Sequence, residues 1–224
     1  MTYVVADLHG NQTKFRQLLQ EISFRETDVL YVIGDIVDYG DESMELIVDL
    51  SVRYNVYPIL GDHDLRAARM LSGFEKMLKT GTDKPDSSYV TEMMAWMQDG
   101  GQKTLEGYRS PDAEMREGVL EYLEDMALYE EVTLKGKHYL LVHAGIAGFG
   151  PGVSLEDLGP GAFVTEPLDM TRAYLPDTTV IVGHVPTADG KIAYGNGSIC
   201  IDCGTAESGR IGCLRLDDGC EFYI

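Results

Sequence analysis

The sequence lacks the features that would place it in or across a membrane. No apolar run in its 224 residues approaches the roughly 20 residues that a membrane-spanning helix requires. Its first residues, MTYVVADLHGNQTK, have no basic flank and no long apolar core, and so do not resemble a secretory signal. We therefore expect a cytoplasmic protein without a membrane partner.

Basic residues are scarce. The chain has 18 Lys and Arg against 37 Asp and Glu, which gives a formal net charge of −19. A surface with this balance repels phosphate backbones and so argues against a nucleic-acid partner. It equally disfavours a phosphorylated substrate, unless the binding site itself supplies positive charge.

Cysteine is confined to the last part of the chain, at Cys200, Cys203, Cys213 and Cys220. The spacing of the first two resembles half of a zinc site or a redox pair. However, they lie in the alternating run SICIDCG, which predicts a strand, and strand residues three apart point to opposite faces. We expect free, mostly buried thiols in a reducing compartment.

What the sequence does contain is a repeated pattern of short apolar runs that stop abruptly at Gly, Asp or His. Continuous apolar runs of this length are typical of strands that are buried on both faces. The runs lie at 2–10, 28–40, 56–64, 138–145, 178–186 and 198–204.

Two segments with helical periodicity separate the first three runs, over 11–22 and 41–54. In the first, apolar residues at i, i+3, i+4 and i+7 form one face of a helix. The alternation of strand and helix predicts parallel βαβ units and an α/β fold. The residues of that apolar face are Phe15, Leu18, Leu19 and Ile22.

The segment 64–127 differs from the rest, because it is rich in Met, Glu and Gly and has few apolar residues of its own. We interpret it as a helical insertion in a single domain that spans 1–224, with a loop over 81–88. Its expected helices lie near 65–79, 88–99 and 112–126.

The remainder of the chain predicts further strands. A β-hairpin is expected around a turn at 135–137, followed by a Gly- and Pro-rich loop over 145–161. The whole pattern predicts two packed sheets with helices outside, and polar strand ends gathered at the edge where α/β sheets bind ligands. The last strands, expected to be antiparallel, lie at 191–195, 197–202, 210–217 and 220–224.

Histidine and aspartate recur at the ends of the apolar runs. Bringing these groups together without compensating charge would cost several kcal/mol, and divalent cations remove that cost. Mixed Asp/His ligation suits Mn, Fe or Zn better than Ca or Mg, and a pair of such ions activates water for attack at phosphorus. The residues are His9, His63, His143 and His184, with Asp7, Asp35, Asp38, Asp62 and Asp64.

Five short motifs carry a resemblance to a known family. Their order and spacing are similar to the series DxHG, GDxxDRG, GNH[DE], HAG and GH of calcineurin-like metallophosphoesterases, and are most similar to the bacterial and phage-type serine/threonine phosphoprotein phosphatases. The resemblance implies a four-layer α-β-β-α sandwich of two mixed sheets flanked by helices. The motifs are DLHG (7–10), GDIVDYG (34–40), GDHD (61–64), HAG (143–145) and GH (183–184).

The resemblance also implies two divalent ions, of which Mn²⁺ is our first choice, with Fe, Zn or Mg as the others. It implies a bridging hydroxide that attacks phosphorus directly and His63 as the general acid, oriented by Asp38. We expect Asp64 to be the N-cap of the following helix. The implied ligands are Asp7 and His9 for the first ion, Asp35 for both, and Asp62, His143 and His184 for the second.

Three positions depart from the family pattern. Asp62 stands where the family has Asn, and Tyr39 where it has a phosphate-clamping Arg. Glu166 lies near the position of a second family Arg, for which Arg172 is a candidate substitute. Together these changes predict a site that keeps its metals but has lost positive charge for gripping phosphate.

The main expectation is a metal-dependent phosphoesterase that acts on phosphomonoesters, with phosphoserine or phosphothreonine proteins and small phosphoesters as candidate substrates. A first alternative is a dinucleoside polyphosphate hydrolase, because that group shares these motifs, although the acidic surface argues slightly against bulky polyanions. A second is a regulatory module that binds metals but is weakly active or non-catalytic. A domain without metals would leave the clustered carboxylates without counter-charge.

Overall fold

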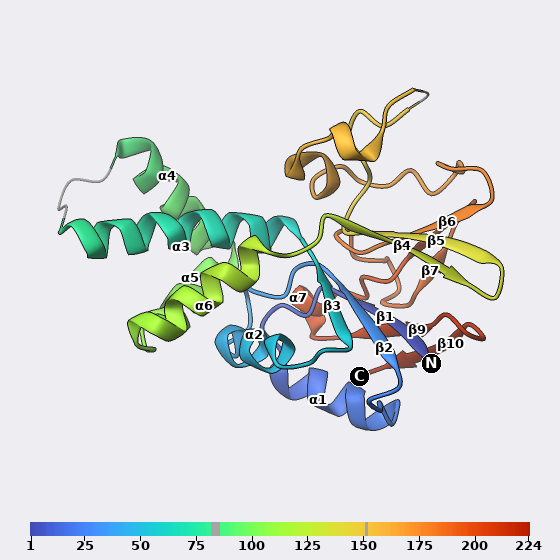
Figure 1. Ribbon diagram of the computed structural model, residues 1–224, viewed down its shortest axis with the longest axis horizontal. Coiled ribbons are helices and arrows are strands. Elements are labelled where there is room, and N and C mark those ends of the chain that lie inside the picture. Colours follow the sequence, from blue (N-terminus) through green and yellow to red (C-terminus); the bar gives the residue numbers. More distant parts are fainter. Residues whose placement is uncertain (82–85, 151) are drawn as a thin grey trace.

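Two mixed five-stranded sheets form the centre of the structure, a computed structural model that describes residues 1–81, 86–150 and 152–224 (Figure 1). The first sheet has the order β10-β9-β1-β2-β3 and the second the order β4-β5-β6-β8-β7. The strands are β1 (Thr2–Ala6), β2 (Val29–Ile33), β3 (Val56–Ile59), β4 (Tyr129–Leu134), β5 (Lys137–Val142), β6 (Thr178–Val182), β7 (Ala193–Tyr194), β8 (Ser198–Cys200), β9 (Gly212–Arg215) and β10 (Cys220–Tyr223).

Helices cover the outer face of the first sheet and extend beyond it to one side (Figure 1). Strands β1, β2 and β3 pair in parallel and are joined through α1 and α2, which confirms the predicted βαβ units. The helices are α1 (Gln12–Glu21), α2 (Ser43–Ser51), α3 (Asp62–Thr80), α4 (Ser87–Trp96), α5 (Gln102–Tyr108), α6 (Ala113–Glu124) and α7 (Thr205–Ser208).

Alternate residues of the central strands pack the two sheets against each other. Val4 of β1 and Ile33 of β2 lie in one buried cluster with Leu141 of β5 and Ile181 of β6. The residues between them point outward, because successive strand side chains face opposite sides of a sheet. Continuous apolar strands therefore serve both faces, as their sequences predict.

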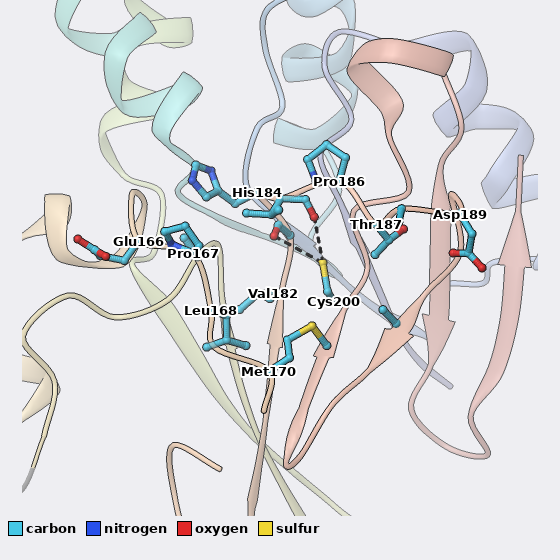
Figure 2. A pocket seen from close by; sticks show the side chains of 15 residues that line it. Glu166, Pro167, Leu168, Met170, Val182, His184, Pro186, Thr187, Asp189 and Cys200 are labelled. Atoms are coloured by element: carbon cyan, nitrogen blue, oxygen red, sulfur yellow. Dashed lines mark hydrogen bonds between the residues drawn. The ribbon is translucent and has the colours of Figure 1, made fainter. Parts of the chain in front are cut away.

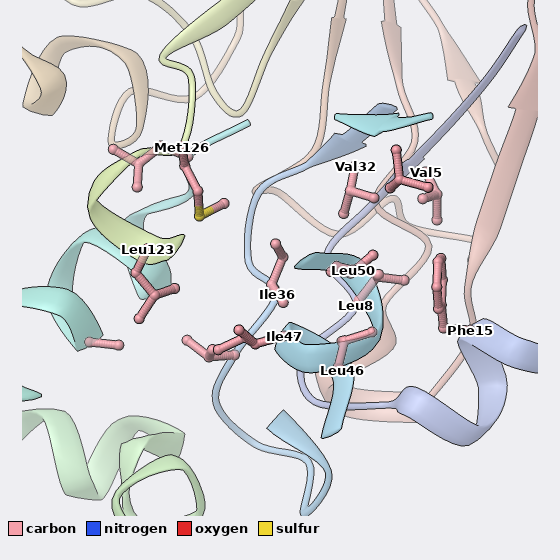
Figure 3. Close-up of a cluster of buried hydrophobic side chains, with 14 of the residues drawn as sticks. Val5, Leu8, Phe15, Val32, Ile36, Leu46, Ile47, Leu50, Leu123 and Met126 are labelled. Carbon is pink, nitrogen blue, oxygen red and sulfur yellow. The ribbon is translucent and has the colours of Figure 1, made fainter. Parts of the chain in front are cut away.

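The outer face of the first sheet packs on α1 and α2. Figure 3 shows Val5 and Val32 of the sheet together with Phe15 of α1 and Leu46 and Leu50 of α2, and all five side chains are buried. These contacts hold the carboxyl ends of β1 and β2 in place, which is where the polar motifs begin.

The segment between β3 and β4 is more deeply packed than its composition suggests. Trp96, Tyr108, Val119 and Leu123 are all buried and belong to the same apolar cluster as the first sheet. A few large side chains provide this packing, although the segment has few apolar residues of its own. The segment also begins earlier than predicted, since α3 starts at Asp62.

A kink interrupts this helical segment where one helix was predicted near 88–99. Helix α4 ends at Trp96, and the chain passes through Met97–Gly101 (η1), where Asp99 and Gly100 have non-helical backbone angles, before the additional helix α5. Of the predicted loop over 81–88, residues 82–85 lie outside the described part of the chain.

The outer face of the second sheet is covered by irregular chain rather than by long helices. The predicted Gly- and Pro-rich loop contains two 3₁₀ turns, η2 (Leu155–Asp157) and η3 (Pro160–Phe163). The ring of Phe163 stacks on Tyr129 of β4, with ring centroids 5.5 Å apart. Short turns are enough to cover this face of the sheet, because the loop contributes apolar side chains such as Phe163.

The C-terminal strands form the two predicted antiparallel pairs, but the pairs belong to different sheets. β7 pairs with β8 in the second sheet, where β8 also runs parallel to β6, whereas β9 and β10 extend the first sheet. Cys200 and Cys203 lie in different apolar clusters, as expected for opposite faces, and the four cysteines are free thiols. Among the described residues, no helix is long and apolar enough to cross a membrane.

Replacing Phe15 by Ala tests the packing that positions the ends of β1 and β2. We expect a loss of about 3–5 kcal/mol in the free energy of unfolding, since a buried aromatic ring leaves a cavity. Chemical denaturation measures it. Val52→Ala is the matched control, because Val52 is 75% exposed, and its loss should stay near zero. Equal losses in the two variants would contradict this account of the core.

Candidate metal centre

The predicted site residues converge at one edge of the two sheets, although they come from five separate segments. Asp7 and His9 follow β1, and Asp35 and Asp38 follow β2. Parallel strands end at the same edge, so these groups meet without any long loop. The remaining residues are Asp62 and His63 in the first turn of α3, His143 after β5 and His184 after β6.

Two groups of donors share one residue. Asp7, His9 and Asp35 form the first group, and Asp35 with Asp62, His143 and His184 forms the second. Within each group the ligand atoms lie within 4.8 Å of one another, close enough to surround one ion. Because Asp35 belongs to both groups, the arrangement suits a pair of bridged ions, and it matches the sets that the sequence predicted.

The carboxylate of Asp7 is the clearest sign that an ion belongs here. Its Oδ1 accepts a hydrogen bond from the His184 backbone at 3.1 Å, but its buried Oδ2 has no hydrogen-bond partner. Burial, together with the charges of Asp202 and Asp35, raises the pKa of Asp7 well above its ordinary value. A buried anionic oxygen without a partner is costly, and a cation would remove that cost.

Backbone carbonyls orient two of the imidazoles. Nδ1 of His9 lies 3.0 Å from the Val37 carbonyl oxygen, and Nδ1 of His143 lies 3.2 Å from that of Ile33. Each ring therefore turns Nε2 toward the carboxylates, with His9 Nε2 3.8 Å from Asp35 Oδ2. Such outer contacts fix the tautomer and direction of metal-binding histidines.

Asp62 connects the second donor group. Its Oδ1 accepts hydrogen bonds from His143 Nε2 at 3.0 Å and from His184 Nδ1 at 2.9 Å. Burial opposes ionisation of Asp62, but these two hydrogen bonds hold its pKa below the ordinary value. Burial also disfavours a charged His143, yet Asp35 and Asp62 raise its pKa to about 10. A protonated His143 would thus supply part of the positive charge that ions would otherwise bring.

His63 and Asp38 form the predicted pair beside these groups. His63 Nδ1 lies 2.8 Å from Asp38 Oδ2, and the His63 backbone donates to Asp35 Oδ1 at 3.1 Å. Asp38 is completely buried and accepts two more hydrogen bonds from the helical segment, from Trp96 Nε1 at 2.9 Å and from Thr104 Oγ1 at 2.7 Å. The sequence did not indicate that Trp96 and Thr104 bind Asp38, because neither of these two residues lies near a recognised motif.

Backbone conformation also distinguishes the site. Nine non-glycine residues of the described chain have a positive φ, and six of these nine are candidate site residues. Side chains other than glycine rarely adopt this conformation, which costs about 1–3 kcal/mol each and persists where surrounding structure imposes it. The six are Asp7 (54°), His9 (43°), Asp35 (49°), Asp38 (73°), Tyr39 (62°) and His184 (68°).

Asp64 corrects one expectation. The helix N-cap is Gly61, and Asp64 lies three positions later, where its carboxylate accepts from the Gly61 backbone at 3.0 Å. It also accepts from the Ile36 backbone at 2.9 Å and so ties α3 to the loop after β2. Burial, followed by the charge of Asp35, raises its pKa to about 7. Asp64 is therefore the N3 residue of α3, whose side chain binds the backbone N–H of the N-cap residue, and it is not the N-cap itself.

The two candidate substrate-binding residues are placed very differently. Tyr39 lies at the site, with its ring centroid 5.0 Å from that of His9 and 5.2 Å from that of His63. Arg172 has its described contacts elsewhere, 3.4 Å from Asp169 and over the ring of Tyr174 at 5.0 Å. The geometry therefore gives no support to Arg172 as a phosphate ligand.

Comparison with known proteins agrees with the motif series. The sequence model of a family described as calcineurin-like phosphoesterase matches residues 2–209. A symmetrical bis(5'-nucleosyl)-tetraphosphatase of Haemophilus ducreyi is 34% identical over 103 residues, which cover 43% of this chain and 37% of the relative. One from Pseudomonas putida is 32% identical over 117 residues, covering 49% and 38%. The matched region thus spans little more than a third of these relatives.

Solved structures share the fold at low sequence identity. The crystal structure of a proposed diadenosine tetraphosphatase has a TM-score of 0.67 and 19% identity, over 100% of this chain and 92% of the other. A protein serine/threonine phosphatase from Saccharomyces cerevisiae has a TM-score of 0.59 and 14% identity, over 100% and 78%. These likenesses confirm the expected fold class.

Metal binding should release protons and strengthen as the pH rises. His143 is protonated below a pKa of about 10 and Asp7 has a raised pKa, whereas an ion binds only the deprotonated groups. Titration calorimetry with Mn²⁺ at about pH 6 and pH 8, in buffers of different ionisation enthalpy, measures the protons released. An affinity independent of pH, with no proton release, would contradict the site.

Proposed function

Because the chain belongs to the calcineurin-like phosphoesterase family, we propose that it is a hydrolase that cleaves phosphoester or phosphoanhydride bonds with two divalent metal ions. The observation that carries this proposal is the position of Asp35. It is common to both donor groups, and its Oδ1 accepts from the backbone of His63. This hydrogen bond holds the backbone of the candidate acid next to the residue that both donor groups share.

The site residues have two proposed roles, metal binding and proton donation. Bound ions would polarise the phosphoryl group and activate water, and Mn²⁺ remains our first choice because of the mixed Asp/His donors. Asp7, His9, Asp35, Asp62, His143 and His184 would hold the ions. His63 donates a proton to the leaving oxygen, and Asp38 keeps the ring oriented and stabilises its protonated form.

We favour a dinucleoside polyphosphate as substrate because an apolar cleft adjoins the metal centre. Figure 2 shows Leu168 and Met170 facing Val182 and Cys200, with His184 at the upper end. The cavity measures about 360 Å³, within the range of small-molecule sites. His184 lines the cleft and also belongs to the second donor group. A nucleoside seated there would place its phosphates toward the ions.

Two carboxylates among the cleft residues support this orientation. Glu166 and Asp189 line the cavity, and neither would tolerate a phosphate chain nearby. Carboxylates do accept hydrogen bonds from ribose hydroxyls and amino groups. The named relatives act on such molecules, and symmetrical cleavage of diadenosine tetraphosphate would yield two molecules of ADP.

A phosphomonoester, as in a phosphorylated serine or threonine, is the second candidate. The observation that favours it is the His63–Asp38 pair at 2.8 Å. An alkoxide leaving group needs a proton, whereas a nucleoside diphosphate is a weak base and leaves without one. The pair therefore matters more for an ester than for an anhydride.

The first test measures both metal content and product pattern. Protein purified with Mn²⁺ should bind about two ions per chain and convert diadenosine tetraphosphate to ADP faster than it hydrolyses p-nitrophenyl phosphate or a phosphothreonine peptide. His63→Ala should lower turnover of the phosphothreonine peptide by about 10²–10⁴-fold and should affect the anhydride and the p-nitrophenyl ester less, because their leaving groups are weak bases. Chromatography of the products quantifies each rate.

His138→Ala is the matched control, since His138 is exposed on β5 and contacts Thr133. It should behave as wild type on all substrates. Faster hydrolysis of the phosphothreonine peptide than of the dinucleotide would favour the second candidate. Two bound ions with no turnover of any of these compounds would instead favour a regulatory module.

Asp62→Asn tests whether the extra carboxylate weakens the grip on anionic substrates. An amide oxygen can still coordinate an ion, but it removes one negative charge beside the reacting phosphate. We expect the bound metal to remain near two ions per chain and kcat/KM for the preferred substrate to rise about tenfold. Steady-state kinetics measures this, and a fall in kcat/KM at full metal content would contradict it.

A further inference from the structure

Tyr39 and Arg66 meet at a single carboxylate beside the metal centre. The Tyr39 hydroxyl donates to Asp99 Oδ1 at 2.9 Å, and Arg66 Nη1 donates to Asp99 Oδ2 at 2.8 Å. Two donors from different parts of the chain thus point at the two oxygens of one anion. A phosphate group presents a similar pair of acceptor oxygens to such donors.

The position of this triad suits a substrate at the ions. Arg66 lies one helical turn after Asp62 on α3, and both line a cavity of about 410 Å³ that also includes Val164 and Thr165. Tyr39 packs against the imidazoles, with its ring centroid 5.0 Å from that of His9 and 5.2 Å from that of His63. The donors therefore lie at the rim of the site rather than on a distant surface.

Solvent and ligands can reach all three side chains. The exposed fraction is 34% for the Arg66 side chain, 50% for that of Asp99 and 40% for Tyr39. An ion pair this exposed is weak, so a competing anion can displace the carboxylate at small cost.

The kink in the helical segment keeps Asp99 in place. Asp99 and Gly100 have non-helical backbone angles, and the Tyr39 N–H donates to the Gly100 carbonyl at 3.1 Å. A Cβ on Gly100 would lie 2.9 Å from atoms of the Tyr39 ring, closer than real Cβ atoms come to other atoms. The close approach requires glycine, and it fixes the carboxylate next to the Tyr39 hydroxyl.

We propose that Arg66 and Tyr39 form a binding site for a phosphoryl group of the substrate, and that Asp99 occupies this site as an internal competitor. The inference rests on the proposed function only for the phosphorylated class of ligand. Arg66 would supply the positive charge that the chain lacks at position 39, delivered from α3 instead of from the loop after β2. Asp99 acts as a positioning residue that holds both donors.

Binding of inorganic phosphate to the Mn²⁺-loaded full chain tests this directly. Calorimetry should show Kd raised about tenfold by Arg66→Ala, because a charged donor is lost, and lowered about tenfold by Asp99→Asn, because the competing charge is gone. Tyr39→Phe should raise Kd about threefold. In kinetics, Asp99→Asn should lower KM more than it changes kcat.

Asp218→Asn is the matched control for the lost charge. Asp218 forms a bidentate pair with Arg215 at 2.8 Å, and Arg215 is in register with Tyr3, at the opposite end of β1 from Asp7. If Asp218→Asn tightens phosphate binding as much as Asp99→Asn does, the effect is general and the proposal fails.

An unchanged Kd in Arg66→Ala would overturn the proposal by itself, whatever Asp99→Asn does to the kink. Arg66 is partly exposed on α3, and thermal unfolding verifies that the variant is folded. The phosphate Kd does not depend on which ester or anhydride is hydrolysed. A failure of the proposed substrate is therefore distinguishable from a failure of this site.

Discussion

Electrostatic repulsion among buried carboxylates is the constraint on which the architecture of the site depends. Asp7 and Asp35 lie together with almost no exposure, and Asp202 adds a third buried carboxylate whose pKa burial also raises. Such a cluster is unfavourable unless positive charge joins it. Asp35 and Asp62 raise the pKa of His143 to about 10, so its imidazole can supply part of this charge, whereas the buried Oδ2 of Asp7 has no hydrogen-bond partner. The positive φ angles of several donor residues add a separate conformational cost to this electrostatic one.

The helical segment after β3 is an integral part of the site. Its first turn supplies Asp62 and His63, its later helices supply Trp96 and Thr104 to Asp38, and its kink supplies Asp99 to Tyr39. A change in this segment would therefore alter the orientation of the candidate acid and the availability of the candidate phosphate donors. It is better regarded as one wall of the site than as a separate lid or docking surface.

The candidate site lies in a chain with a net charge of −19, and two of its positions carry less positive charge than the family pattern. Where the family carries Arg, this chain has Tyr39, and where it carries a neutral amide, this chain has Asp62. Both changes lower the local potential for an anion. Arg66, a positive side chain that lines a cavity together with Asp62, is held by the carboxylate of Asp99. Under the proposed function, the apolar cleft beside His184 would bind the nucleoside part of the substrate through contacts that need no charge.

The sequence by itself determined the strands, the first two helices and the candidate donor residues, because apolar periodicity and Asp or His at strand ends are local signals. It also determined the departures at Tyr39 and Asp62, which can be read from the motifs alone. Only the tertiary structure decided that Trp96, Thr104 and Asp99 reach the site, since those contacts join residues about 60 positions apart. It also set Arg172 apart from the donors and brought Arg66 and Tyr39 to the same carboxylate, because distance in the folded chain follows from packing and not from motif order.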